Sequence, residues 1–212
     1  MDNLETLLTM KEVFSLEDIK FGVNRLANGK AKDIEGYQAE ILKIGGLVLI
    51  PHIHKIFKQA VKQGFPKPWT ESLIIPIFKS VDTNNPSSYS IIMISPLLAK
   101  LYGSILEKKL SIWLESEGKQ AKGQVGFRRH HSTTDHLVTL RIIEEECRND
   151  KSNLFCCFVD FRKAFDTVLR YNLWNLLEEL KVPLELKVVA IRLYENVIAK
   201  LKSNEGWNEC LK

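Results

Sequence analysis

Apolar residues recur at helical spacing through the first third of the chain. One stripe starts behind Ser15, a residue type that caps helices well, and an acidic residue three positions later completes the capping pattern. Two more stripes cover residues 37–44 and 47–63, and Gly45-Gly46 separates them. Because glycine interrupts helices, this pattern predicts two short helices here rather than one.

The same spacing predicts four helices in the rest of the chain. Ser95-Pro96 opens a stripe that runs to about Leu114, and Ser132 opens another that runs to about Asp150. Two further helices are expected over residues 172–180 and 183–201. Helices therefore dominate the predicted structure.

Two segments have the composition of β-strands. Residues 71–79 are rich in Ile, but Pro76 predicts an edge or bulged strand because proline has no N–H to donate. The apolar run Leu154–Val159 predicts a buried strand. Since the helices and strands do not alternate regularly, the pattern favours an α+β fold.

The composition is that of a globular protein without a membrane span. Of the 212 residues, 45% are hydrophobic and 26% are charged, with a net charge of +4. No apolar run approaches the roughly 20 residues that cross a bilayer. The four cysteines form no Cys-x-x-Cys pair, which argues against a zinc site or a disulfide framework.

Basic residues concentrate in two regions. Residues 20–79 carry ten Lys or Arg against four acids, and residues 119–131 carry four Lys or Arg, two His and no acid. Such regions are typical of proteins that contact phosphate-rich partners, and equally of basic loops that only interact with solvent. The second region, with Phe127 near its end, is interpreted either as a nucleic-acid-binding loop or as a solvated loop.

Asp160 is the strongest candidate for chemistry. It stands at the end of the predicted strand, where a charge is costly unless it has a partner such as a divalent metal. Enzymes of phosphoryl and nucleotidyl transfer use carboxylates in this way. The alternative is an ordinary surface Asp at the end of a strand.

Several segments, in the right order and at the right spacing, resemble the reverse transcriptases of non-LTR retrotransposons of the long-interspersed-element type. The segments are NGKAKDIEGYQAEILK, WTESLIIPIFKS, NPSSYSIIMISPLLAKLYGSILEKKL, QVGFRRHHSTTDH and FVDFRKAFDTV. They are similar to a segment ahead of the fingers, the first fingers motif with its following helix, the second motif and the first palm motif. Together they run through most of the chain.

This resemblance implies a role for five residues. Asp160 would bind catalytic Mg²⁺, and the backbone carbonyl of Phe161 would be a further ligand. Phe165 would lie under the incoming sugar and exclude a 2′-hydroxyl, which selects deoxynucleotides. Arg128 would lie near the template and the incoming nucleotide, and Lys79 would contact phosphate. Asp166, in contrast, is interpreted as a structural residue that caps the next helix.

The resemblance also implies an architecture and partners. The α+β fold would consist of the helix-rich fingers and an incomplete palm of a right-hand polymerase. Residues 1–64 would be an N-terminal helical extension of the fingers, 65–153 the fingers, and 154–212 part of the palm. The implied partners are an RNA template with a DNA primer, and deoxynucleotides. The implied location is the nucleus, the cytoplasm or both, without a membrane.

The sequence departs from the family in ways that affect activity. The family's second carboxylates belong to a Tyr-x-Asp-Asp segment, and these 212 residues contain no Asp-Asp pair. We therefore expect a truncated fragment without polymerase activity, which self-associates through the uncovered edge of its palm. Two alternatives are a non-catalytic nucleic-acid-binding module and a decayed relic of a mobile element.

Overall fold

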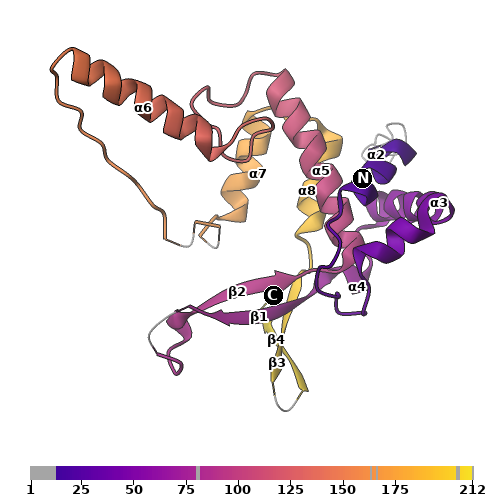
Figure 1. Ribbon diagram of the computed structural model, residues 1–212. Helices are drawn as coiled ribbons and strands as arrows, with labels where there is room; N and C mark the ends of the chain where they lie inside the picture. Colours follow the sequence, from indigo (N-terminus) through magenta and orange to yellow (C-terminus); the bar gives the residue numbers. More distant parts are fainter. Residues whose placement is uncertain (1–12, 80–81, 163, 166, 204–205, 212) are drawn as a thin grey trace. The chain divides into compact units, whose positions relative to one another are not determined.

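The computed structural model describes residues 13–79, 82–162, 164–165, 167–203 and 206–211 (Figure 1). The chain divides into two compact units, Met1–Lys109 with Val182–Lys212, and Leu110–Lys181. Each unit is described by itself. Helices occur together with a small sheet, which agrees with the predicted α+β class.

An aromatic cluster forms the core of the first unit. Tyr102 of α5 (Leu97–Ser116) is fully buried, and its ring centroid lies 4.4 Å from that of Phe14 and 5.0 Å from that of Phe57 in α3 (Ala39–Gln63). Phe65 and Trp69, the latter in the short helix α4 (Lys67–Thr70), extend the cluster. Tilted and edge-to-face ring pairs of this kind stabilise a core by about 0.5–1.5 kcal/mol each beyond their buried area.

The predicted helix start behind Ser15 is confirmed. At the start of α2 (Leu16–Arg25), the Asp18 N–H donates to Ser15 Oγ at 3.1 Å and the Ser15 N–H donates to Asp18 Oδ2 at 3.0 Å. The two predicted stripes of residues 37–63 fall largely in α3, which begins at Ala39 rather than at residue 37, and Gly46 interrupts it with a φ of 40° and a ψ of −126°. Because a side chain would strain this backbone, the kink requires glycine.

The sheet of the first unit has four strands in the order β2-β1-β3-β4. β1 (Glu71–Phe78) pairs antiparallel with β2 (Tyr89–Ile94), and it pairs parallel with β3 (Ile198–Ser203) only from Glu71 to Ile74. The prediction of an edge or bulged strand is wrong for β1 as a whole, because β1 lies between β2 and β3, but Pro76 lies in the part of β1 that pairs with β2 alone. β4 (Gly206–Leu211) pairs antiparallel with β3.

The C-terminal prediction of a helix over residues 183–201 is wrong in its second half. The helix α8 covers only Leu184–Leu193, and residues 198–203 form β3 instead. The start of β1 supplies the backbone partners that make a strand favourable there. Lys200 Nζ also lies 2.6 Å from Glu71 Oε2, so an ion pair joins the two parallel strands.

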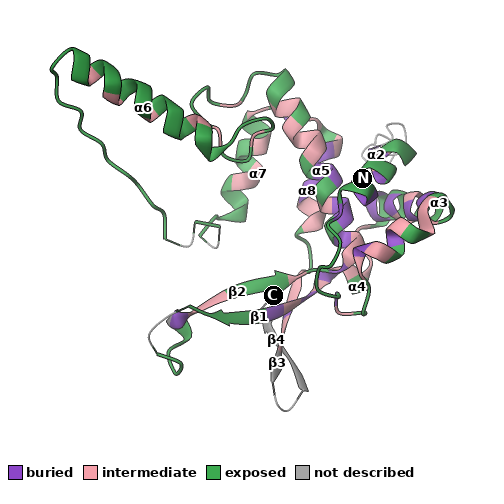
Figure 2. Ribbon diagram, in the orientation of Figure 1, coloured by how far each residue is buried: buried purple, intermediate pink, exposed green. Residues whose placement is uncertain are grey.

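The second unit contains little buried surface. It holds the end of α5, together with α6 (Thr133–Asn149) and α7 (Arg170–Glu179). Every residue of α6 and α7 is described, and none of them is buried (Figure 2). The apolar stripe of α6 therefore stays in contact with solvent.

The prediction of a buried strand over residues 154–159 is wrong. These residues have no regular secondary structure, and Phe155 and Phe158 are 89% and 84% exposed. A strand needs a neighbour to accept and donate its backbone hydrogen bonds. No strand is present among the described residues of this unit, so the apolar run has nothing to pair with.

Candidate nucleic-acid interface

The basic loop 119–131 connects α5 to α6 in the second unit. Phe127 and His130 in this loop have positive φ angles of 59° and 60°. Residues other than glycine rarely adopt this conformation, which costs roughly 1 kcal/mol or more at each position. Phe127 is nevertheless 87% exposed. A strained backbone thus presents an aromatic ring to solvent beside basic residues.

Arg128 forms a two-pronged ion pair with Glu115 in the last turn of α5. Its Nε donates to Glu115 Oε2 at 3.1 Å, and its Nη2 donates to Glu115 Oε1 at 2.7 Å. The Arg128 side chain is 20% exposed and the Glu115 side chain is 52% exposed. The hydrogen bond from Arg128 lowers the pKa of Glu115. This geometry fixes the orientation of the guanidinium plane.

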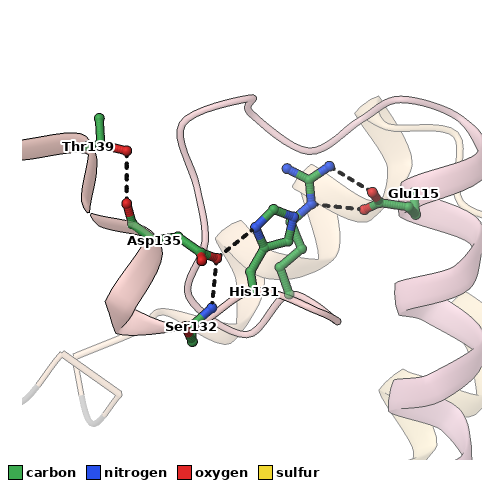
Figure 3. A network of polar contacts seen from close by, with 6 residues as sticks. Glu115, His131, Ser132, Asp135 and Thr139 are labelled. Atoms are coloured by element: carbon green, nitrogen blue, oxygen red, sulfur yellow. Dashed lines mark hydrogen bonds and ion pairs between the residues drawn. The ribbon is translucent and has the colours of Figure 1, made fainter. Parts of the chain in front are cut away.

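The loop enters α6 through a hydrogen-bonded cap (Figure 3). The Ser132 N–H donates to Asp135 Oδ2 at 2.9 Å, which confirms the predicted capping pair. His131 Nδ1 lies 3.3 Å from the same oxygen, and Thr139 Oγ1 donates to the Asp135 carbonyl at 2.8 Å. A carboxylate at this place also interacts favourably with the positive end of the helix dipole.

The segment that holds Asp160 lies between α6 and α7, and it is exposed. Asp160 has no regular secondary structure around it, and Phe161 and Phe165 are 76% and 78% exposed. The Phe165 ring meets the Phe127 ring edge to face, with centroids 6.0 Å apart and planes at 88°. The structure therefore brings the basic loop and the FVDFRKAFDTV segment together at this ring pair.

The described residues contain no cluster of metal-ligating side chains around Asp160. Mg²⁺ requires near-octahedral coordination by oxygen atoms, usually with one or two carboxylates among them. No three His, Cys, Asp or Glu side chains among the described residues are placed to hold a metal ion. Asp166 lies outside the described residues. Asp160 and the Phe161 carbonyl could supply two oxygen ligands, and further oxygen atoms would have to complete the coordination of a metal there.

Lys79 belongs to the first unit, whereas Arg128, Asp160 and Phe165 belong to the second. It directly follows β1 and is exposed, and its N–H donates to the Ser88 carbonyl at 2.8 Å. This bond closes the β1–β2 hairpin next to Lys79. Because Lys79 is exposed, its ammonium group is accessible to an anionic ligand.

Three cysteines of the described residues are free thiols. They are Cys147, Cys156 and Cys157, and the last two are exposed. Within the described part of the chain, no helix combines the length and the apolar character that crossing a membrane requires.

Comparison with known proteins identifies the relatives of this chain. The probable RNA-directed DNA polymerase from transposon X-element of Drosophila melanogaster is 28% identical over 162 residues, or 74% of the chain. The chain is related to the reverse transcriptases of non-LTR retrotransposons. The RNA-directed DNA polymerase from mobile element jockey of Drosophila melanogaster is 26% identical over 156 residues, or 73% of the chain. The resemblance seen in the sequence is thereby confirmed.

A third relative is the retrovirus-related Pol polyprotein from type-1 retrotransposable element R2 of Popillia japonica, 30% identical over 117 residues, or 55% of the chain. The matched regions span only 16–17% of the length of these three relatives. No protein-family model matches the chain. The relation therefore concerns a short part of much longer proteins.

Two contacts of this interface have no signal in the sequence. Glu115 is one of 26 acidic residues, and nothing in its spacing marks it as the partner of Arg128. The contact between Phe127 and Phe165 joins two motifs that the sequence shows only separately. Both contacts depend on how the loops fold, which local patterns do not encode.

Proposed function

We propose that this chain is part of an RNA-directed DNA polymerase, and that its second unit contacts the RNA template and the incoming deoxynucleotide. The relation to three retrotransposon proteins supports this assignment. The observation that carries it is the contact between Phe127 and Phe165, because it joins the basic loop to the segment that holds Asp160. Phosphate-binding and nucleotide-selecting residues of one site have to be neighbours in this way.

In this proposal each residue acts through ordinary chemistry. The guanidinium of Arg128 binds a template phosphate, and the exposed ring of Phe127 stacks on a base. Phe165 fills the space that a 2′-hydroxyl would need, and so favours deoxynucleotides. Lys79 binds phosphate as a point charge.

The proposal extends to the architecture. Residues 65–153 would form the fingers of a right-hand polymerase, residues 1–64 their helical extension, and residues 154–212 part of the palm. Asp160 and the Phe161 carbonyl would supply two ligands of a divalent metal. Carboxylates that do not belong to the described residues would supply other ligands. The chain would act on RNA with a DNA primer, in the nucleus, the cytoplasm or both.

The test is binding of an RNA template annealed to a DNA primer, measured by fluorescence anisotropy at several salt concentrations. Affinity should fall steeply between about 50 and 200 mM salt, because phosphate contacts release counterions. Phe127→Ala should weaken binding roughly 5- to 100-fold, the loss expected for one stacked base. Phe155→Ala is the matched control, since Phe155 is 89% exposed in the same unit and should not affect binding.

A second candidate function is nucleic-acid binding without catalysis. It is favoured by the lack of an Asp-Asp pair in the 212 residues and of a metal-binding cluster among the described ones. A primer-extension assay separates the two functions. Extension that Asp160→Asn abolishes would establish the polymerase, whereas binding without extension would establish the binding module for these residues. Absence of binding at low salt would contradict both.

A further inference from the structure

We propose that Glu115 is a positioning residue, which orients Arg128 so that the free end of its guanidinium binds an RNA phosphate. The inference rests on the proposed function, in which Arg128 contacts the template. It concerns a residue outside every motif that the sequence singles out.

Among the described residues, Glu115 occupies one edge of the Arg128 guanidinium and leaves the end of the group unused. Arginine has five N–H donors, and Arg128 uses one on Nε and one on Nη2 to bind the two oxygens of Glu115. Three donors remain, two on Nη1 and one on Nη2. The Nη2 donor and one of the Nη1 donors point in parallel from the end of the guanidinium, and a phosphate can accept these two side by side.

Glu115 is well placed to hold this orientation. It stands in α5, a helix of 20 residues, whereas Arg128 stands in a loop of short turns. A long side chain on such a loop samples many rotamers, and losing that freedom on binding reduces affinity. The ion pair to a helix restricts Arg128 before the ligand arrives.

The negative charge of Glu115 gives two opposite predictions for how its removal changes the affinity for RNA. The basic loop 119–131 contains no acidic residue, so Glu115 is the carboxylate that partly neutralises it at Arg128. Simple electrostatics predicts that removing an acid beside a phosphate-binding loop strengthens RNA binding. Positioning predicts the opposite, because an unrestrained Arg128 binds less well.

The experiment compares variants for binding to a short RNA annealed to a DNA primer. Glu115→Ala should weaken binding about 3- to 10-fold despite the gain in net charge, as expected for one newly mobile side chain. Glu115→Gln, which keeps one acceptor oxygen, should restore part of the loss. In the Arg128→Ala background, Glu115→Ala should cause no further weakening.

Glu144→Ala is the matched control. Glu144 also accepts hydrogen bonds from two arginines, Arg141 and Arg148, but on the exposed surface of α6. Its removal should leave RNA binding unchanged or slightly stronger. Circular dichroism and the thermal midpoint should be the same for all of these variants.

Tighter binding by Glu115→Ala, or equal weakening in the Arg128→Ala background, would overturn the inference. A wild-type chain that binds no RNA would contradict the proposed function instead. Side-chain NMR of the Arg128 Nε–H group then decides the inference by itself. A signal that shows restricted guanidinium rotation in the wild type and free rotation in Glu115→Ala supports positioning, and equal rotation in both refutes it.

Discussion

The carboxylate of Asp33 accepts the backbone N–H of Leu97 at 2.8 Å, and so ties the loop after α2 to the first residue of α5. Its other oxygen accepts the N–H groups of Tyr37 at 2.8 Å and of Glu35 at 3.1 Å. Asp33 is only 9% exposed. A buried carboxylate at the start of a helix satisfies unpaired amides and interacts favourably with the helix dipole.

Replacing Asp33 should destabilise the protein markedly. Asp33→Ala leaves three partly buried N–H groups without an acceptor, and the free energy of unfolding should fall by about 2 kcal/mol or more. Urea unfolding followed by circular dichroism measures the change. Asp82→Ala is the control, because the Asp82 carboxylate accepts the N–H of Asn84 in an exposed turn, and its removal should cost less than about 0.5 kcal/mol. Equal effects of the two substitutions would contradict the anchoring role.

Tyr102→Phe should not destabilise the protein, although Tyr102 lies at the centre of the core. Among the described residues, no group forms a hydrogen bond with the Tyr102 hydroxyl, and a buried hydroxyl without a partner costs about 1–3 kcal/mol. Removing it keeps the ring contacts and should leave the free energy of unfolding unchanged or raise it by about 1 kcal/mol. Urea unfolding provides the measurement. A loss of stability larger than that of Tyr89→Phe, which removes an exposed hydrogen bond to the Thr83 carbonyl, would show that the hydroxyl has a partner.

The same tyrosine should make stability depend on pH in alkaline solution. Burial raises the pKa of Tyr102 above its ordinary value, and the charge of Arg192 opposes this only in part. Above about pH 10 the unfolded tyrosine loses its proton while the folded one keeps it. The contribution of Tyr102 is therefore fully present below about pH 10 and is lost as the pH rises further. Urea midpoints measured from pH 9 to 11 should fall more steeply for the wild type than for Tyr102→Phe, and parallel curves would contradict the prediction.

Thiol labelling should report the exposed state of residues 154–159. In a Cys210→Ser variant of the native protein, Cys156 and Cys157 should react with a thiol reagent about as fast as in urea, because both are exposed. Cys147, of intermediate exposure on α6, should react more slowly and serves as the internal reference. Mass spectrometry after short labelling times gives the rate at each site. Strong protection of Cys156 and Cys157 would instead support the buried strand that the sequence predicts.

Local signals in the sequence predict two helix starts and the interruption of α3 correctly. The Ser15–Asp18 and Ser132–Asp135 pairs start helices because each carboxylate binds an amide only three residues away. Gly46 kinks α3 because only glycine adopts its backbone angles easily. Pro76 lies where β1 has one neighbour because proline lacks an N–H. Each of these effects depends on a single residue or on residues a few positions apart.

The order of the motifs also relates the chain to retrotransposon reverse transcriptases, a relation that comparison with known proteins confirms. The roles of Lys79, Arg128, Asp160, Phe161 and Phe165 remain predictions from that relation. In the described residues, the structure assembles no metal site around Asp160. The sequence thus identifies candidate residues, but it does not show whether they meet.

Only the tertiary structure decided which distant segments pair. The apolar run 154–159 is exposed because the described residues of its unit form no strand beside it, whereas residues 198–203 become a strand because β1 pairs with them. Arg128 meets Glu115, and Phe127 meets Phe165, through loop conformations with positive φ angles. A strand or an ion pair is stable only when its partner is in place, and the position of a distant partner is a property of the whole fold.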